Sequence, residues 1–152
     1  MTVKDQILEQ LRQQKDAVSD ADFQSRKREW LASLSQLFST LSEWTREAAA
    51  EGLLSRENYD VKINEEQLGT YSAPALRLKT PSGSTVEIRP RATYILGGNG
   101  RVDWEGSSGR KAMLVGTDSK EWEFAELQSG GHWYFRPLSE ESFWEVIGYL
   151  LE

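Results

Sequence analysis

The sequence contains no cysteine and only one histidine among its 152 residues. Without thiols, it cannot form disulfides, iron–sulfur clusters, cysteine nucleophiles or cysteine-ligated zinc sites. The single imidazole, His132, excludes a two-histidine metal site within one chain, and no catalytic partner stands near it in any known motif. We therefore expect no metal, no cofactor and no enzymatic activity.

Long hydrophobic runs are also missing. No stretch approaches the ~20 apolar residues that a membrane-spanning helix needs, and residues 1–9 lack the apolar segment of an export signal. The sequence therefore predicts a cytoplasmic protein without membrane association. The net charge of −6 argues against nucleic acid as a partner, because phosphate backbones attract basic proteins.

The residues that are present are typical of a folded protein, because 38% are hydrophobic and the aromatic ones comprise six Trp, five Tyr and five Phe. A chain of this length can bury a sufficient core without metal or disulfide. Charge is distributed unevenly along it. Residues 112–152 carry eight acidic and two basic side chains, whereas residues 84–111 carry five basic and three acidic ones.

Residues 1–55 are predicted to form a helical segment of two helices, the second starting after the N-cap residues at 19–22. The alternative is that residues 19–22 are the polar middle of one long bent helix. The second helix has a seam too short for a coiled-coil dimer, so we expect it to pack on its own sheet. Whether residues 1–20 also pack there or extend towards another chain stays open. The seam residues are Trp30, Leu34, Leu37, Leu41, Trp44 and Ala48.

Residues 56–152 change to an apolar period of two, which is typical of β-strands, and short Gly/Ser turns separate the segments. The turns are too short for crossover helices, so the strands should be antiparallel. Ser139 is a good N-cap for a last helix. The predicted fold class is α+β: an N-terminal helical hairpin, an antiparallel β-meander of about six to seven strands, and a C-terminal helix packed on the sheet, in one structural domain. Strand-like segments occur at 59–63, 76–78, 86–88, 93–96, 101–105, 111–115, 121–124 and 132–135.

Alternation predicts one apolar face for this sheet and places Tyr134 on the opposite, outer face. Trp144 lies beside the apolar stripe of the last helix, so these two aromatic residues are expected to be the most exposed. The residues predicted for the apolar face are Val86, Ile88, Val102, Trp104, Trp122, Phe124, Trp133 and Phe135.

Two patterns imitate catalytic or phosphate-binding sites. Asp103 with Glu105, and Glu121 with Glu123, could act as carboxylate pairs, but alternating charge is also ordinary on an open sheet face. The glycine stretches 98–103 and 106–112 precede strands, whereas phosphate loops require a following helix. We interpret the first pattern as surface charge and the second as hairpin turns.

The basic residues of neighbouring hairpins form the candidate interaction surface, together with the two aromatic residues expected to be exposed. They are either a charge-paired sheet face or a docking patch for a carboxylate-rich or phosphate-bearing partner. The leading hypothesis is a non-catalytic module, adaptor or inhibitor that binds another protein or itself. The alternative is a module that binds a small anionic ligand, or a weak enzyme. The candidate residues are Arg89, Arg91, Arg101, Arg110, Lys111, Tyr134 and Trp144.

Overall fold

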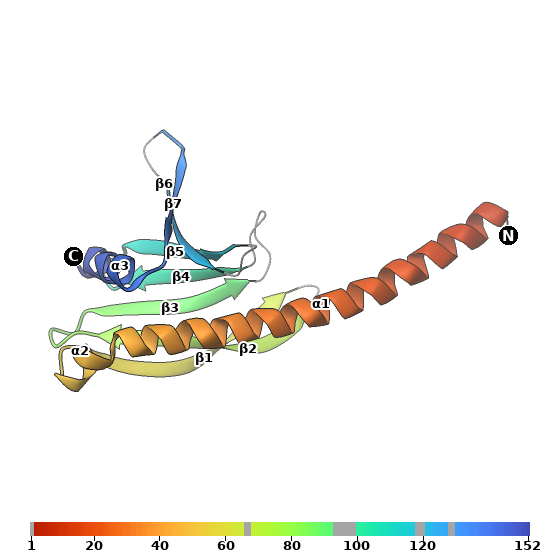
Figure 1. The fold of residues 1–152 in the computed structure, drawn as a ribbon. Coiled ribbons are helices and arrows are strands. Elements are labelled where there is room, and N and C mark those ends of the chain that lie inside the picture. Colours follow the sequence, from red (N-terminus) through yellow and green to blue (C-terminus); the bar gives the residue numbers. More distant parts are fainter. Residues whose placement is uncertain (1, 66–67, 93–99, 118–120, 128–129) are drawn as a thin grey trace.

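The computed structural model describes residues 2–65, 68–92, 100–117, 121–127 and 130–152, with their side chains except those of residues 14–23, 92 and 127. Within these residues the chain has the predicted α+β fold, in which helices pack against a seven-stranded antiparallel sheet (Figure 1). The helices are α1 (Val3–Trp44), α2 (Arg46–Ala50) and α3 (Glu140–Leu151). The strands are β1 (Ser55–Glu65), β2 (Gly69–Lys79), β3 (Thr85–Ala92), β4 (Arg101–Gly106), β5 (Lys111–Gly116), β6 (Trp122–Leu127) and β7 (Trp133–Pro137).

The strands lie side by side in the order of the sequence, from β1 at one edge to β7 at the other. Every neighbouring pair is antiparallel, which confirms the predicted meander. The strand-like segment predicted at 93–96 lies outside the described residues, as do 97–99, 118–120 and 129 of the predicted turns.

Helix α1 begins with a capping box, in which the Thr2 hydroxyl accepts from the Asp5 N–H and the Asp5 carboxylate accepts from the Thr2 N–H. It continues without interruption to Trp44, so the break predicted at 19–22 is wrong and the alternative of one long helix is correct. The boundary between the two N-terminal helices lies instead at Thr45. Capping residues start a helix only weakly when helix formers stand on both sides, because elongation is cooperative.

The hydrophobic core lies between the sheet and the helices, and it forms one continuous cluster. The second half of α1 packs along β2, and α3 packs over β3, β4 and β5 (Figure 1). Trp30, Leu34, Leu37 and Leu41 are all buried, which confirms that the helical seam packs on its own sheet.

Trp104 is the largest fully buried side chain of this core. Its ring meets Phe124 of β6 edge-on at 5.1 Å between centroids, and Phe143 of α3 edge-on at 5.8 Å. Such contacts add to the free energy of area burial and fix how α3 lies on the sheet. Six of the eight residues predicted for the apolar face contribute to the core: Val86, Ile88, Val102, Trp104, Trp122 and Phe124.

The prediction for the apolar face is wrong for Trp133 and Phe135, which are 50% and 57% exposed. The register sets Arg136 opposite Phe124, so the even-numbered residues of β7 share the face of Phe124 and the odd-numbered ones lie on the outer face. Tyr134 is exposed as expected, but on the other face. Because three aromatic residues follow one another here, a period of two gives no signal that fixes the face.

Gly106 allows α3 to approach β4, since an added Cβ would lie 2.1 Å from the carbonyl oxygen of Leu150. We expect Gly106→Ala to destabilise the fold by about 1–3 kcal/mol, because the helix backbone has to shift. The matched control is Gly148→Ala in α3, where an added Cβ meets nothing within 4 Å. That change should be neutral or stabilise by up to about 1 kcal/mol. Chemical denaturation measures both, and equal stability of the two variants would contradict this account.

Candidate interaction surface

Three of the predicted site residues, Arg89, Arg91 and Arg101, lie together over β3 and β4. Arg91 and Arg101 share one carboxylate, since their Nε atoms lie 3.1 Å and 2.5 Å from the two carboxylate oxygens of Asp103. One carboxylate therefore serves two guanidinium groups.

Arg89 is held less tightly, with nitrogen atoms 3.5 Å from Glu87 and 3.7 Å from Glu105. Glu87 also accepts a hydrogen bond of 2.7 Å from Arg77, which raises the pKa of that guanidinium, and Arg77 reaches Glu57 at 2.8 Å. The outer face of β1 to β4 is thus a charge ladder of cross-strand ion pairs. Exposed pairs of this kind contribute little to stability, about 0–1 kcal/mol each.

A groove opens where β6 separates from β5. The pairing of β4 with β5 extends to Lys111, whereas the pairing of β5 with β6 ends at Met113 and Ala125. Beyond that point β6 and β7 continue as a two-stranded ribbon that projects from the sheet (Figure 1). The groove has a volume of about 970 Å³, and Trp133 of the ribbon lines it. Its charged lining on the ladder side consists of Arg89, Arg91, Arg101, Lys111, Asp103 and Glu105.

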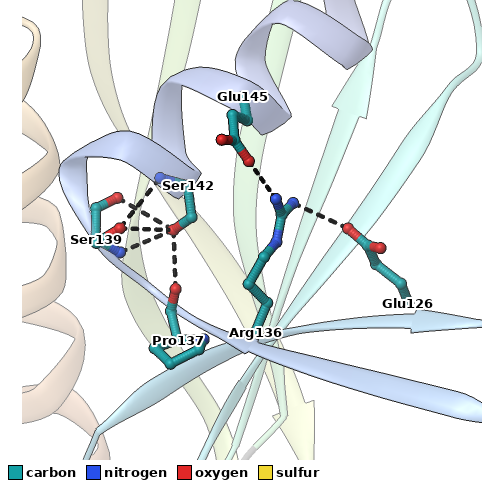
Figure 2. A network of polar contacts seen from close by, with 6 residues as sticks. All are labelled: Glu126, Arg136, Pro137, Ser139, Ser142 and Glu145. Carbon is teal, nitrogen blue, oxygen red and sulfur yellow. Dashed lines mark hydrogen bonds and ion pairs between the residues drawn. The ribbon is translucent and has the colours of Figure 1, made fainter.

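Arg136 connects the base of the ribbon to α3 (Figure 2). Its guanidinium donates to Glu126 of β6 at 3.0 Å and to the carboxylate of Glu145 on α3. Beside it the Ser142 hydroxyl, part of the capping box of α3, donates to the carbonyl of Pro137 at 2.9 Å. These contacts fix the direction in which the ribbon leaves the sheet.

The ribbon exposes three consecutive aromatic side chains, Trp133, Tyr134 and Phe135, at 50%, 58% and 57%. An isolated two-stranded hairpin is only marginally stable in water, and this ribbon is supported at its base by β5 and by the contact of Arg136 with α3. Sequence reasoning placed only Tyr134 in the candidate surface. The signal for the other two was the run of aromatics between a Gly-Gly turn and a proline.

The remaining predicted residues do not all join this region. Arg110 reaches α3, where it pairs with Glu152 at 2.7 Å and lies 4.8 Å from the ring centroid of Tyr149. Trp144 is 36% exposed on α3 and its ring packs edge-on against Phe143. Lys111 lines the groove and makes no ion pair among the residues that the structure describes.

The first half of α1 extends away from the sheet as an arm, which we define as residues 3–24 (Figure 1). At 1.5 Å per residue the arm is roughly 30 Å long. Every side chain from residue 2 to residue 13 is exposed. The question of whether residues 1–20 pack on the sheet is thus answered for 2–13, which do not.

Trp30 anchors the arm where it meets the sheet. Its indole Nε1 donates to the hydroxyl of Tyr71 at 3.0 Å, and that hydroxyl donates to Glu65 at 2.5 Å. The ring of Trp122 lies 6.1 Å away on one side. The backbone at Gly100 lies close against the Trp30 ring, and a Cβ there would lie 2.1 Å from that ring.

Other kinds of site find no support in the described part of the chain. Within it, no group of three or more His, Cys, Asp or Glu side chains is arranged to hold a metal ion. None of its helices combines the length and the apolar character needed to cross a bilayer. No protein-family model, curated protein or solved structure matches the sequence or the fold.

The hydrogen bonds around Trp30 make the stability of the protein depend on pH in the alkaline range. Burial raises the pKa of Tyr71 above its ordinary value, and the hydrogen bond to Glu65 raises it further. Unfolded tyrosine ionises near pH 10, so this contribution to stability is complete below about pH 10 and is lost as the pH rises further. In Tyr71→Phe, the free energy of unfolding should therefore fall less steeply above about pH 10 than in the wild type.

Tyr71→Phe should also cost about 1 kcal/mol at neutral pH, because the indole of Trp30 loses its acceptor. Denaturant unfolding at a series of pH values measures both effects. Tyr149→Phe, at a tyrosine that is 48% exposed, is the control for the cost at neutral pH and should change the free energy of unfolding by less than about 0.5 kcal/mol. Identical slopes for Tyr71→Phe and the wild type would contradict the role of this anchor.

Proposed function

We propose that this chain is a non-catalytic interaction module that binds another protein by inserting the tip of the arm into an apolar groove of that partner. One observation carries the proposal: an apolar stripe at the tip of the arm faces water. Its four side chains are 75%, 48%, 37% and 53% exposed, in the order Val3, Ile7, Leu8 and Leu11.

The spacing of these residues supports binding by one face of the helix. Val3, Ile7 and Leu11 follow one another at intervals of four, and Leu8 widens the stripe, which is the pattern of helices that bind in grooves. Within residues 3–13, the other side of the helix carries an ion pair between Glu9 and Arg12. Four apolar side chains within nine residues form a short stripe, which suits a groove better than a long coiled coil.

The energies are those of a reversible complex. Complete burial of a fully exposed Val, Leu or Ile side chain contributes about 1.5–3 kcal/mol. Because the four side chains of the stripe are only 37% to 75% exposed, their burial contributes about 3–6 kcal/mol in total. Association costs about 4–15 kcal/mol, and less when the binding element is already ordered. The capping box at Thr2 and Asp5 supports the helical form of the arm before it binds, which lowers that cost.

The test compares two double variants that add the same charge to opposite faces of the arm. Ile7→Asp with Leu11→Asp alters the stripe, whereas Gln6→Asp with Gln13→Asp is the matched control. Proteins captured from the native cell extract are quantified for each variant and for the wild type. We expect one partner to bind the wild type and the control, and to be lost with the stripe variant because carboxylates would be buried in its groove.

The partner is then purified and titrated against all three proteins, since capture alone does not show direct binding. Circular dichroism and thermal unfolding confirm that the variants fold. Equal affinity of the partner for the stripe variant and the control would overturn the proposal.

A second candidate function is the binding of a small anionic ligand in the groove. Two features favour it: Lys111 lacks an acidic partner among the described residues, and Asp103 is shared by two arginines. The neighbouring carboxylates Asp103 and Glu105 oppose it, because an anion has to compete with them for the guanidinium groups.

Thermal unfolding in the presence of phosphate or citrate tests the second function, because a ligand that binds only the folded state raises its stability. A rise in the melting temperature that Lys111→Ala abolishes would support the groove. Lys79→Ala, at an exposed lysine outside the groove, is the control. No rise in the wild type with either anion would exclude phosphate and citrate as ligands.

A further inference from the structure

The two edge strands of the sheet differ in how they are protected. A bare edge presents unpaired backbone groups to other strands, and proteins usually protect it with charges, proline or a short length. The edge strand β1 carries charges throughout its eleven residues: Arg56, Glu57, Asp60, Lys62 and Glu65. The edge strand β7 has a single charged residue, Arg136, and three exposed aromatic ones.

The backbone of β7 has free groups at two positions. The N–H of Leu138 donates to the carbonyl of Trp122, which fixes the alternation of hydrogen bonds between β6 and β7. Residues 134 and 136 therefore direct their backbone groups to β6, whereas residues 133 and 135 direct theirs to the open edge. Pro137 also faces the open edge, where its missing N–H breaks no bond within the sheet. Its carbonyl already accepts from Ser142.

We propose that β7 pairs antiparallel with β7 of a second copy of this chain, about a two-fold axis at Phe135. In this register Phe135 lies opposite Phe135 of the second copy, and the two residues exchange both N–H···O bonds. Trp133 then lies opposite Pro137, and Tyr134 opposite Arg136. The two outward-facing aromatic rings of each copy thereby lose exposure to water, and the contact buries no unpaired charge.

Charge favours a second copy in this register. Arg136 is the only charged residue of β7. In the dimer it lies opposite Tyr134 of the second copy, so the two arginines do not face each other and each can make a cation–π contact. The pairing is isologous, so it closes after two chains, and the charged β1 edges at the outer ends stop further growth. The ribbon projects from the sheet (Figure 1).

The absence of cysteine from the sequence permits a direct test by cross-linking. Two residues that form a hydrogen-bonded antiparallel pair have Cα atoms about 5.5 Å apart, which lies within the range that a disulfide spans. Under mild oxidation, Phe135→Cys should therefore form a disulfide-linked dimer. Tyr134→Cys is the matched control, because its exposed fraction is almost the same, 58% against 57%, but its symmetry mate lies diagonally across the axis.

Sedimentation of the unmodified chain over a range of concentrations gives a second measurement. A strand this short provides a small interface, so the dimer should be weak and its fraction should rise with concentration. Phe135→Glu should remain a monomer throughout, because it places two carboxylates opposite each other. Leu53→Glu, at a side chain that is 54% exposed in the turn between α2 and β1, should dimerise like the wild type. Thermal unfolding shows whether each variant is folded.

The dimer does not depend on the arm, so Phe135→Cys is also tested together with Ile7→Asp and Leu11→Asp and should cross-link equally well. A failure of the arm proposal thus leaves this result unchanged. The proposal is overturned if Phe135→Cys cross-links no better than Tyr134→Cys. It is also overturned if the unmodified chain remains a monomer at every concentration.

Discussion

The apolar face of the sheet has to be shielded from water, and the rest of the structure depends on how the chain does this. The second half of α1 covers the β2 side of the sheet, and α3 covers β3 to β5. Phe143 of α3 contacts Trp104 of β4 at the centre of this cover. Where this cover ends, two elements extend beyond the core: the arm at one end of α1 and the β6–β7 ribbon at the far edge. Both expose apolar side chains, and the two proposed contacts rest on these.

The basic residues predicted as a docking patch are engaged in ion pairs within the chain. Arg89, Arg91 and Arg101 gather on the sheet as predicted, but each has a carboxylate within ion-pair distance. Their positive charge is therefore largely compensated before any partner arrives. The apolar tip of the arm and the aromatic side chains of β7 stay exposed to water in the part of the chain that the structure describes. These are the surfaces whose burial would change the free energy most.

Sequence reasoning was accurate where the pattern reflects a local rule. Period-two alternation located the described strands, short turns fixed their antiparallel order, and the heptad-like spacing from Trp30 to Trp44 identified the buried side of α1. It failed at residues 19–22, where N-cap residues lie within a continuous helix. It failed again at β7, where consecutive aromatic residues fit either face of a strand equally well.

The sequence by itself determined the fold class, the meander, the absence of thiol chemistry and the gathering of arginines, because each follows from residue type or from spacing along the chain. Only the tertiary structure decided which apolar residues are left uncovered. Val3 and Ile7 are four residues apart, as Trp30 and Leu34 of the buried seam are, and Trp133 has the same chemistry as Trp104. Whether such a side chain is buried depends on whether another element reaches it. That depends on where α1 and α3 end relative to the sheet, which no local pattern encodes.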